Sequence, residues 1–326
     1  MADTEDTEMT DKFSDLLHRE WKTFPSSSSS SSSPPFRIMY FNLLASGLGD
    51  DQFPDRVDVV RKEKRFPLAL REIERWNCDI VCLCECNHFE DFWIKEMTKL
   101  GYTQHVRLPK MFSPCEYFGA PPDGSAVFFR PRFNLVNDLS FYFFDKKPMI
   151  LVVVKDVEGG EGKELAIGVT HLKAFEKNYE TRGKEVKEGL GRMEFLAGKR
   201  DPKEVPIIFG GDFNEGEGGV VERAVKASKL GLKSSHDTHH PVYTAMDLKA
   251  TWNVRNKVPG CSPGAFRGLL DYVFYTQEKF NLIGIAEEPN FDDLLTLHKE
   301  GKDALGIPNS RYPSDHIAQV CEFQWK

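Results

Sequence analysis

Six short apolar segments of this chain each begin or end at a polar residue of a kind that serves in catalysis. Segments such as 36–41 and 205–209 are typical of buried strands, because short apolar runs beside Gly or Pro favour that structure. The polar residues at the ends of the six segments are Asn42, Glu85, His171, Asp212 with Asn214, Asp271, and Asp315 with His316. One such residue could simply close a strand in an Asx turn. Six positions with oxygen or imidazole groups predict instead a catalytic face built on strand ends.

The oxygen-rich set predicts a hard divalent cation. Carboxylate and amide oxygens suit Mg²⁺ and Mn²⁺, whereas protein sites for Zn²⁺ are dominated by Cys and His. Glu85, Asn42 and Asp315 are the predicted metal ligands. Magnesium would take one or two protein carboxylates, keep several waters and bind a substrate phosphate. The predicted cofactor is therefore Mg²⁺, with Mn²⁺ as the alternative.

Asp212 and His316 are the predicted acid–base groups. Beside a metal-bound phosphate, Asp212 can orient and partly deprotonate an attacking water, and Asn214 would fix its geometry. His316 can be neutral or cationic near pH 7. Asp271 would hold its ring and stabilise its charge, as in other carboxylate–histidine pairs.

His171 and Lys173 are predicted to act on the phosphate itself. They would add hydrogen bonds and positive charge where the phosphoryl oxygens gain negative charge. A single histidine is more often structural than catalytic, so the prediction depends on the whole set. Together these groups predict metal-assisted hydrolysis of a phosphate ester.

Motifs along most of the chain resemble those of a known superfamily. They lie at residues 42–45, 109–110 with 113–115, 122–124, 132–137, 170–174, 211–214, 270–272 and 312–316. On these motifs the chain resembles the endonuclease/exonuclease/phosphatase superfamily, which has the DNase I-like fold, from about Phe36 to Phe323. Within it, the chain is most similar to the branch of nocturnin and the carbon-catabolite-repression deadenylases, and to nocturnin in particular. The resemblance implies an α/β protein with a four-layer α/β/β/α sandwich.

The resemblance also implies roles for individual residues. It assigns Glu85 to the metal, and Asp212 with Asn214 to the water and phosphate. Asp271 and His316 take the paired acid–base position. These assignments agree with the chemistry expected from the residue types alone.

Two substrates remain open, and the basic positions bear on the choice. Lys110, Lys173 and Arg255 match basic positions of nocturnin, whereas Phe175 stands where nocturnin has a basic residue. The overall resemblance slightly favours removal of the 2′-phosphate of NADP(H). The loss of a charge at Phe175 leaves 3′→5′ exonucleolytic cleavage of RNA 3′ ends, including poly(A), as the alternative. A binding module without catalysis would require a damaged catalytic set, and the matching positions are intact.

The loop between Lys110 and Asp123, which is rich in Pro, Phe and Tyr, is predicted to border the site. Its aromatic side chains could stack a base or simply pack within the loop.

Composition limits the partners and the location. The net charge of −7 gives no global basic surface, so an extended grip on duplex nucleic acid is not expected, and protein partners are not indicated. Seven cysteines in 326 residues predict buried thiols rather than a disulfide scaffold. No apolar stretch is long enough to span a membrane, and the acidic start resembles no targeting signal. A cytoplasmic, possibly nuclear, location is expected.

The first 35 residues are predicted to form a disordered tail. They begin with an acidic stretch and end with eight consecutive serines, Ser26 to Ser33, and two prolines. A serine run cannot bury enough apolar surface to order itself. Residues 36–326 are predicted to form a single catalytic domain.

Overall fold

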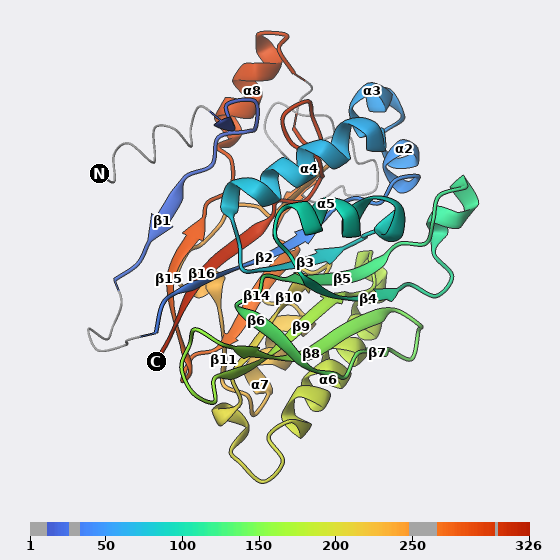
Figure 1. Ribbon diagram of the computed structural model, residues 1–326. Coiled ribbons are helices and arrows are strands. Elements are labelled where there is room, and N and C mark those ends of the chain that lie inside the picture. The colour runs from blue at the N-terminus through green and yellow to red at the C-terminus, as the bar shows by residue number, and fades with distance from the viewer. Residues whose placement is uncertain (1–11, 26–32, 248–265, 304–305) are drawn as a thin grey trace, which may run out of the picture.

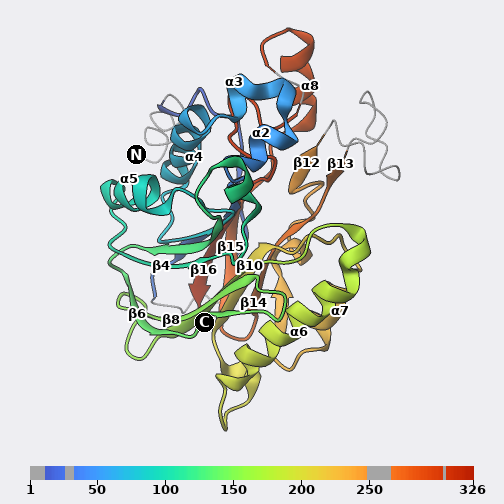
Figure 2. The same ribbon diagram turned by 90° about the vertical axis from the view of Figure 1, so that its right-hand side faces the viewer.

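The computed structural model describes residues 12–25, 33–247, 266–303 and 306–326. Figures 1 and 2 show two large sheets packed face to face between helices. Helices α4 (Lys62–Trp76) and α5 (Ile94–Lys99) cover one sheet, and α6 (Tyr179–Phe195) and α7 (Val220–Ala227) cover the other. The predicted four-layer sandwich is confirmed.

The first sheet has the strand order β1-β15-β16-β2-β3-β5-β4. Its strands are β1 (Trp21–Thr23), β15 (Phe280–Ala286), β16 (Gln319–Trp325), β2 (Phe36–Asn42), β3 (Ile80–Cys84), β5 (Gly124–Phe129) and β4 (Gln104–Pro109). Strands β2 and β3 are parallel, with Asn42 opposite Cys84. Asn42 and Glu85, which follows Cys84, therefore lie at the same edge of this sheet.

The second sheet has the order β11-β14-β10-β9-β8-β6, and β7 also pairs with β8. Its strands are β11 (Leu232–Ser234), β14 (Asp271–Thr276), β10 (Ile207–Asp212), β9 (Glu164–His171), β8 (Pro148–Asp156), β6 (Phe133–Asp138) and β7 (Phe141–Tyr142). Asp212 is opposite His171 in parallel β9 and opposite Asp271 in antiparallel β14. Three of the predicted site residues thus stand in one row.

The remaining elements are short. They are helices α2 (Leu48–Gln52), α3 (Val57–Val60) and α8 (Phe291–Lys299), strands β12 (Ala245–Asp247) and β13 (Phe266–Gly268), the 3₁₀ turns Pro54–Arg56, Pro114–Phe118, Glu176–Asn178, Pro202–Glu204 and Ser235–Asp237, and a π-helical turn at Phe89–Trp93. Among the described residues, no helix is long and apolar enough to cross a bilayer.

Both faces of each sheet are buried, which explains the continuous apolar runs in the sequence. In β2, Ile38 and Tyr40 pack between the two sheets, whereas Met39 and Phe41 pack beneath the helices of the first layer. Strand β3 alternates in the same way, with Cys82 and Cys84 between the sheets. The described cysteines are buried and free, as their sequence context predicts.

Residues 12–25 belong to the folded domain, which corrects the predicted tail. Leu16 and Leu17 are buried, and β1 adds an edge strand to the first sheet by pairing with β15. The side chain of Arg19 is also buried, where it forms an ion pair with Glu72 of α4. This packing has little local signal in the sequence, because the partners of Arg19 lie 53 and 299 positions further along the chain.

Candidate active site

The strand ends of both sheets meet at one edge of the sandwich. Asn42 and Glu85 reach it from the first sheet, and His171, Asp212 and Asp271 from the second. The carboxyl ends of β2 and β3 lie on the right-hand side of Figure 1, the side that faces the viewer in Figure 2. His316 comes from the irregular segment just before β16.

Asn42 bridges two carboxylates from different sheets. Its Nδ2 donates to Glu85 Oε1 at 3.1 Å and to Asp212 Oδ2 at 3.0 Å. The second oxygen of Glu85 accepts the backbone N–H of Ala45 at 3.0 Å. Glu85 and Asn214 both adopt a left-handed backbone with φ of +52°. Such strained conformations in non-glycine residues concentrate at functional sites.

His316 and Asp271 form the predicted pair. Nδ1 of His316 lies 2.9 Å from Asp271 Oδ2, and Nε2 lies 3.7 Å from Asp212 Oδ2. Burial of the ring opposes its protonation, but the charges of Asp271, Asp212 and Asp315 outweigh burial and raise the pKa of His316 well above the usual value. His316 is therefore a cation at neutral pH, with its Nδ1–H donated to Asp271.

Asp212 lies at the centre of the cluster. Its Oδ1 accepts the backbone N–H of Asn214 at 2.8 Å, which fixes the carboxylate against β10. Burial and the nearby Asp271 raise the pKa of Asp212 to about 6, although His316, Asn214 and Asn42 act in the opposite direction. Asp212 is mostly ionised at pH 7 but has a higher proton affinity than an exposed aspartate.

His171 stands on the other side of Asp212. Its Nε2 lies 3.6 Å from Asp212 Oδ2, and its Nδ1 lies 3.9 Å from Glu85 Oε1. Burial, followed by the charges of Lys147 and Lys110, lowers the pKa of His171 well below the usual value. The two histidines therefore differ in charge: His316 is cationic, and His171 is neutral.

The residues at this edge fit a divalent cation. Candidate ligand atoms of Asp212, Asp271 and His316 lie within 4.8 Å of one another, and with His316 protonated the two aspartates supply the oxygens that can bind a cation. Glu85 and Asp212 also direct one oxygen each at the same amide nitrogen of Asn42. Converging carboxylate oxygens of this kind suit Mg²⁺ or Mn²⁺.

The third predicted ligand, Asp315, has neighbours of a different kind. Gln52 Nε2 donates to its Oδ2 at 3.4 Å, and the Ser314 Oγ lies 3.4 Å from its Oδ1. Its role as a ligand remains a prediction, as do the ligand roles of Glu85 and Asn42.

Two of the predicted basic residues lie at the border of the site. Lys110 Nζ lies 3.3 Å from the buried carboxylate of Asp123. The ammonium of Lys110 also interacts electrostatically with Glu85 and His171. Lys173 follows His171 by two residues and is exposed. The prediction for Arg255 lies outside the described residues.

Phe175 is 58% exposed and has a φ of +72°. Arg182 of α6 donates to its backbone carbonyl at 2.7 Å and to that of Lys173 at 3.0 Å. The fold therefore anchors the backbone of this loop and leaves the ring of Phe175 exposed.

Lys147 is a buried cation beside the site that the sequence interpretation missed. Its Nζ donates to the backbone carbonyls of His171, at 3.0 Å, and Leu172. Asn214 Nδ2 also donates to the Leu172 carbonyl, at 3.1 Å. The Lys-Lys-Pro sequence at 146–148 suggested only a hairpin turn, because no local pattern indicates that the side chain of Lys147 contacts the end of β9.

Comparison with known proteins identifies the class of this chain. A family model described as the Endonuclease/Exonuclease/phosphatase family matches residues 39–316. The chain belongs to this family, which confirms the resemblance predicted from its motifs. It is accordingly a metal-dependent phosphoric ester hydrolase.

Individual relatives narrow the comparison to one branch. The chain is 32% identical over 309 residues to nocturnin of Rattus norvegicus and 32% identical over 314 residues to nocturnin of Homo sapiens. These alignments cover 91% and 90% of this chain but 67% and 66% of the relatives, so the chain spans about two thirds of their length. The solved catalytic domain of human nocturnin with a bound sulfate anion superposes with a TM-score of 0.70 at 27% identity, covering 94% of this chain and 98% of that domain.

A more distant relative is the CCR4-Not complex 3′-5′-exoribonuclease subunit Ccr4 of Candida albicans. It is 24% identical over 305 residues, which cover 80% of this chain and 37% of the relative.

Proposed function

We propose that the protein is a Mg²⁺-dependent nucleotide phosphohydrolase and that it removes the 2′-phosphate of NADP(H). The observation that carries the proposal is the position of Asp212 between cationic His316 and the Asn42–Glu85 pair. This arrangement supports the proposed roles, because it groups a proton acceptor, a charged donor and carboxylates that could hold a cation. The similarity to nocturnins over about nine tenths of the chain favours NADP(H).

We assign each part of the reaction to particular residues of the chain. Asp212 accepts a proton from the water that attacks phosphorus as the ester P–O bond breaks. The leaving alkoxide takes a proton from solvent water to become the alcohol. Cationic His316 donates toward a phosphoryl oxygen, and Asp271 keeps it charged. Magnesium, held at Glu85 and Asn42, would neutralise phosphoryl charge when bound.

Other groups orient the substrate. Neutral His171 can donate a hydrogen bond without adding charge, because its pKa is held below the usual value. Lys110 and Lys173 supply positive charge at the border of the site. Phe175 contributes no charge, so these lysines must bind the anionic part of the substrate.

The direct test is phosphate release from NADP⁺ and NADPH in the presence of Mg²⁺. The product should be NAD⁺ or NADH plus one phosphate, and release should stop with EDTA and return with Mg²⁺. NAD⁺, which lacks the 2′-phosphate, is the matched control and should release none. The NADP(H) assignment would be falsified if the same preparation shortened a labelled poly(A) oligomer but left NADP⁺ intact.

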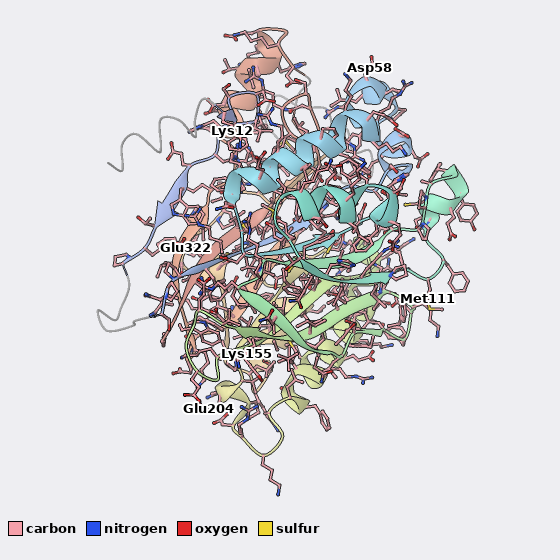
Figure 3. The ribbon with its side chains drawn as sticks, viewed as in Figure 1. Lys12, Asp58, Met111, Lys155, Glu204 and Glu322 are labelled. Atoms are coloured by element: carbon pink, nitrogen blue, oxygen red, sulfur yellow. The ribbon has the colours of Figure 1, made fainter. Side chains whose placement is uncertain are left out.

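A second candidate, 3′→5′ exonucleolytic cleavage of RNA, is favoured by exposed aromatic side chains. Phe112 is 84% exposed and Tyr117 is 92% exposed, and both lie in the loop that begins at Lys110. Met111 of this loop is labelled on the right-hand side of Figure 3. Phe118 of this loop packs close to Gly47, which follows the Asn42–Ala45 turn. Together with Phe175 on the opposite loop, these rings could stack unpaired bases next to the catalytic edge.

A further inference from the structure

The segment that carries His316 has no regular secondary structure of its own. We call residues 311–318 the His316 loop; it connects to β16 at Gln319. Backbone hydrogen bonds to Thr244 and Met246 hold its middle. Its two ends, in contrast, are held by buried arginine side chains from elsewhere in the fold.

Arg65 of helix α4 holds the start of the His316 loop. Its guanidinium donates to the carbonyl of Pro313 at 3.0 Å, directly before Ser314. It also donates to the carbonyls of Leu43 at 2.8 Å and Leu44 at 2.6 Å, just after Asn42. One buried group thus ties together the two segments that present Asn42 and His316.

Arg19 of the N-terminal segment (residues 12–25) holds the other end of the loop. Its Nη2 donates to the carbonyl of Ala318 at 2.8 Å, and its Nη1 pairs with Glu72 of α4 at 2.7 Å. The backbone N–H of Leu17, in the same segment, donates to the carbonyl of Arg311 at 3.2 Å. Figure 3 labels Lys12, where the described part of this segment begins, and its ammonium bonds Glu74 of α4 at 2.7 Å.

A direct hydrogen bond also joins the His316 loop to the segment that carries Asn42. The hydroxyl of Ser314 donates to the backbone carbonyl of Asn42 at 2.7 Å. Helix α4 is the common support, because it supplies Arg65 and also Glu72, the partner of Arg19. Each guanidinium makes several directional hydrogen bonds, which a lysine or an apolar side chain of similar volume cannot reproduce.

We propose that Arg65 and Arg19 are positioning residues that clamp the His316 loop from both ends and so fix His316 relative to Asn42 and Asp212. An apolar side chain could fill either site, and buried ionic groups often add little net stability. What the arginines add is a defined position for carbonyls that flank catalytic residues on both sides. The N-terminal segment is then part of the catalytic apparatus rather than an appendage.

Lysine substitutions test this proposal in the full-length chain. Arg19→Lys keeps a positive charge beside Glu72 but loses the planar guanidinium that also donates to Ala318. Arg65→Lys loses at least one of four carbonyl bonds, because an ammonium has only three N–H donors. We expect each variant to lower kcat for phosphate release from NADP⁺ about tenfold or more, with KM changed less than about twofold, because small misplacement of catalytic groups lowers kcat. Amide hydrogen exchange should rise in peptides covering 311–318.

Two matched controls separate positioning from stability. Arg71→Met removes an exposed α4 contact with the N-terminal segment, where Arg71 pairs with Asp15 and donates to the Lys12 carbonyl; within the described residues, Arg71 makes no hydrogen bond to the His316 loop. Arg132→Lys alters a buried arginine that likewise combines a carboxylate, Asp156, with backbone carbonyls. Asp156 lies at the far end of β8 from the catalytic edge. Neither control should change kcat or exchange in 311–318, even if Arg132→Lys lowers the melting temperature.

The kinetic readout rests on the proposed function, whereas hydrogen exchange does not. If the wild type releases no phosphate from NADP⁺, the proposed substrate fails and exchange alone decides the clamp. Unchanged exchange in 311–318 in folded Arg19→Lys overturns the clamp, as does raised exchange with an unchanged kcat. A loss of kcat in Arg132→Lys equal to that in Arg19→Lys would show a general effect of stability and also overturn it. If Arg65→Lys does not fold, Arg19→Lys decides, because it retains the ion pair.

Discussion

The acid–base part of the catalytic edge and the loops that border it are built in different ways. Asn42, Asp212, Asp271 and His316 are all buried and are bonded to one another. On the bordering loops, Phe175 and the aromatic residues after Lys110 expose their rings. The groups proposed to carry the reaction are therefore buried inside the sandwich, whereas the aromatic side chains proposed to contact substrate are exposed and can change without disturbing the core.

The two parts also differ in electrostatics. In the buried part, close carboxylates raise the pKa of His316, and burial with Asp271 raises that of Asp212. In the bordering loops, Lys173 is exposed and lies in solvent. Substitutions in the first part should thus act mainly on kcat, and substitutions in the second mainly on KM.

The largest effect is expected for Asp212→Asn. The amide has almost the same shape but cannot accept a proton, so kcat should fall on the order of a thousandfold. The folded state should be retained, as measured by circular dichroism and thermal melting. Asp201→Asn, at the exposed start of the 202–204 turn, is the control. An Asp212→Asn variant with more than a tenth of wild-type kcat would remove Asp212 from the reaction.

Glu85→Gln should lower activity at least about a hundredfold, because a neutral amide is a poor ligand for a hard cation. The half-saturating Mg²⁺ concentration should rise, as measured by titrating Mg²⁺ into EDTA-treated protein. The hydrogen bond from Ala45 can persist, so the fold should be unaffected. If the half-saturating Mg²⁺ concentration does not change, Glu85 is not a ligand.

The pH profile should have an acid limb near pH 6 and an alkaline limb governed by His316. Activity should fall as pH drops through about 6, because Asp212 gains a proton and can no longer act as the acceptor. It should also fall as pH rises through the raised pKa of His316, because the ring loses its charge. From the sequence alone, His316 could be neutral or cationic near pH 7; the charges of the buried carboxylates around it favour the cation.

Asp271→Asn tests the assignment of the alkaline limb. Without the Asp271 charge, the pKa of His316 should drop, so this limb should move to lower pH while kcat at neutral pH falls about tenfold. The measurement is kcat against pH at saturating Mg²⁺. An alkaline limb at the same pH in wild type and variant would show that another group governs it.

The smallest effect is expected for Phe175→Arg on a bordering loop. A guanidinium beside the site should lower KM for NADP⁺ several-fold, because arginine–phosphate contacts are strong and directional. If Phe175 stacks a base, the same change should slow shortening of a poly(A) oligomer, since base stacking contributes about 1–3 kcal/mol. Phe195→Arg, at an exposed phenylalanine near the end of α6, is the control. No change with either substrate would mean that Phe175 takes no part in substrate choice.

The sequence predicted which side chains lie together at this edge of the sandwich, because strand ends carry a local signal. Asp212 and Asp271 each stand at the boundary of an apolar run, and the register of β10 and β14 brings them opposite each other. The residues that support them have no such signal. Lys147 was missed because its acceptors, the carbonyls of His171 and Leu172, are defined only when β8 and β9 pair.

By itself, the sequence indicated the family through its motifs, and the resemblance implied the four-layer fold. The apolar runs with polar ends indicated which groups meet at the edge of the sandwich, because this signal is local. Only the tertiary structure decided the charge states of His171 and His316, since these depend on which buried charges surround each ring. It also decided that residues 12–25 belong to the domain. Arg19 stabilises that packing through Glu72 and Ala318, contacts that are 53 and 299 positions away and exist only in the folded chain.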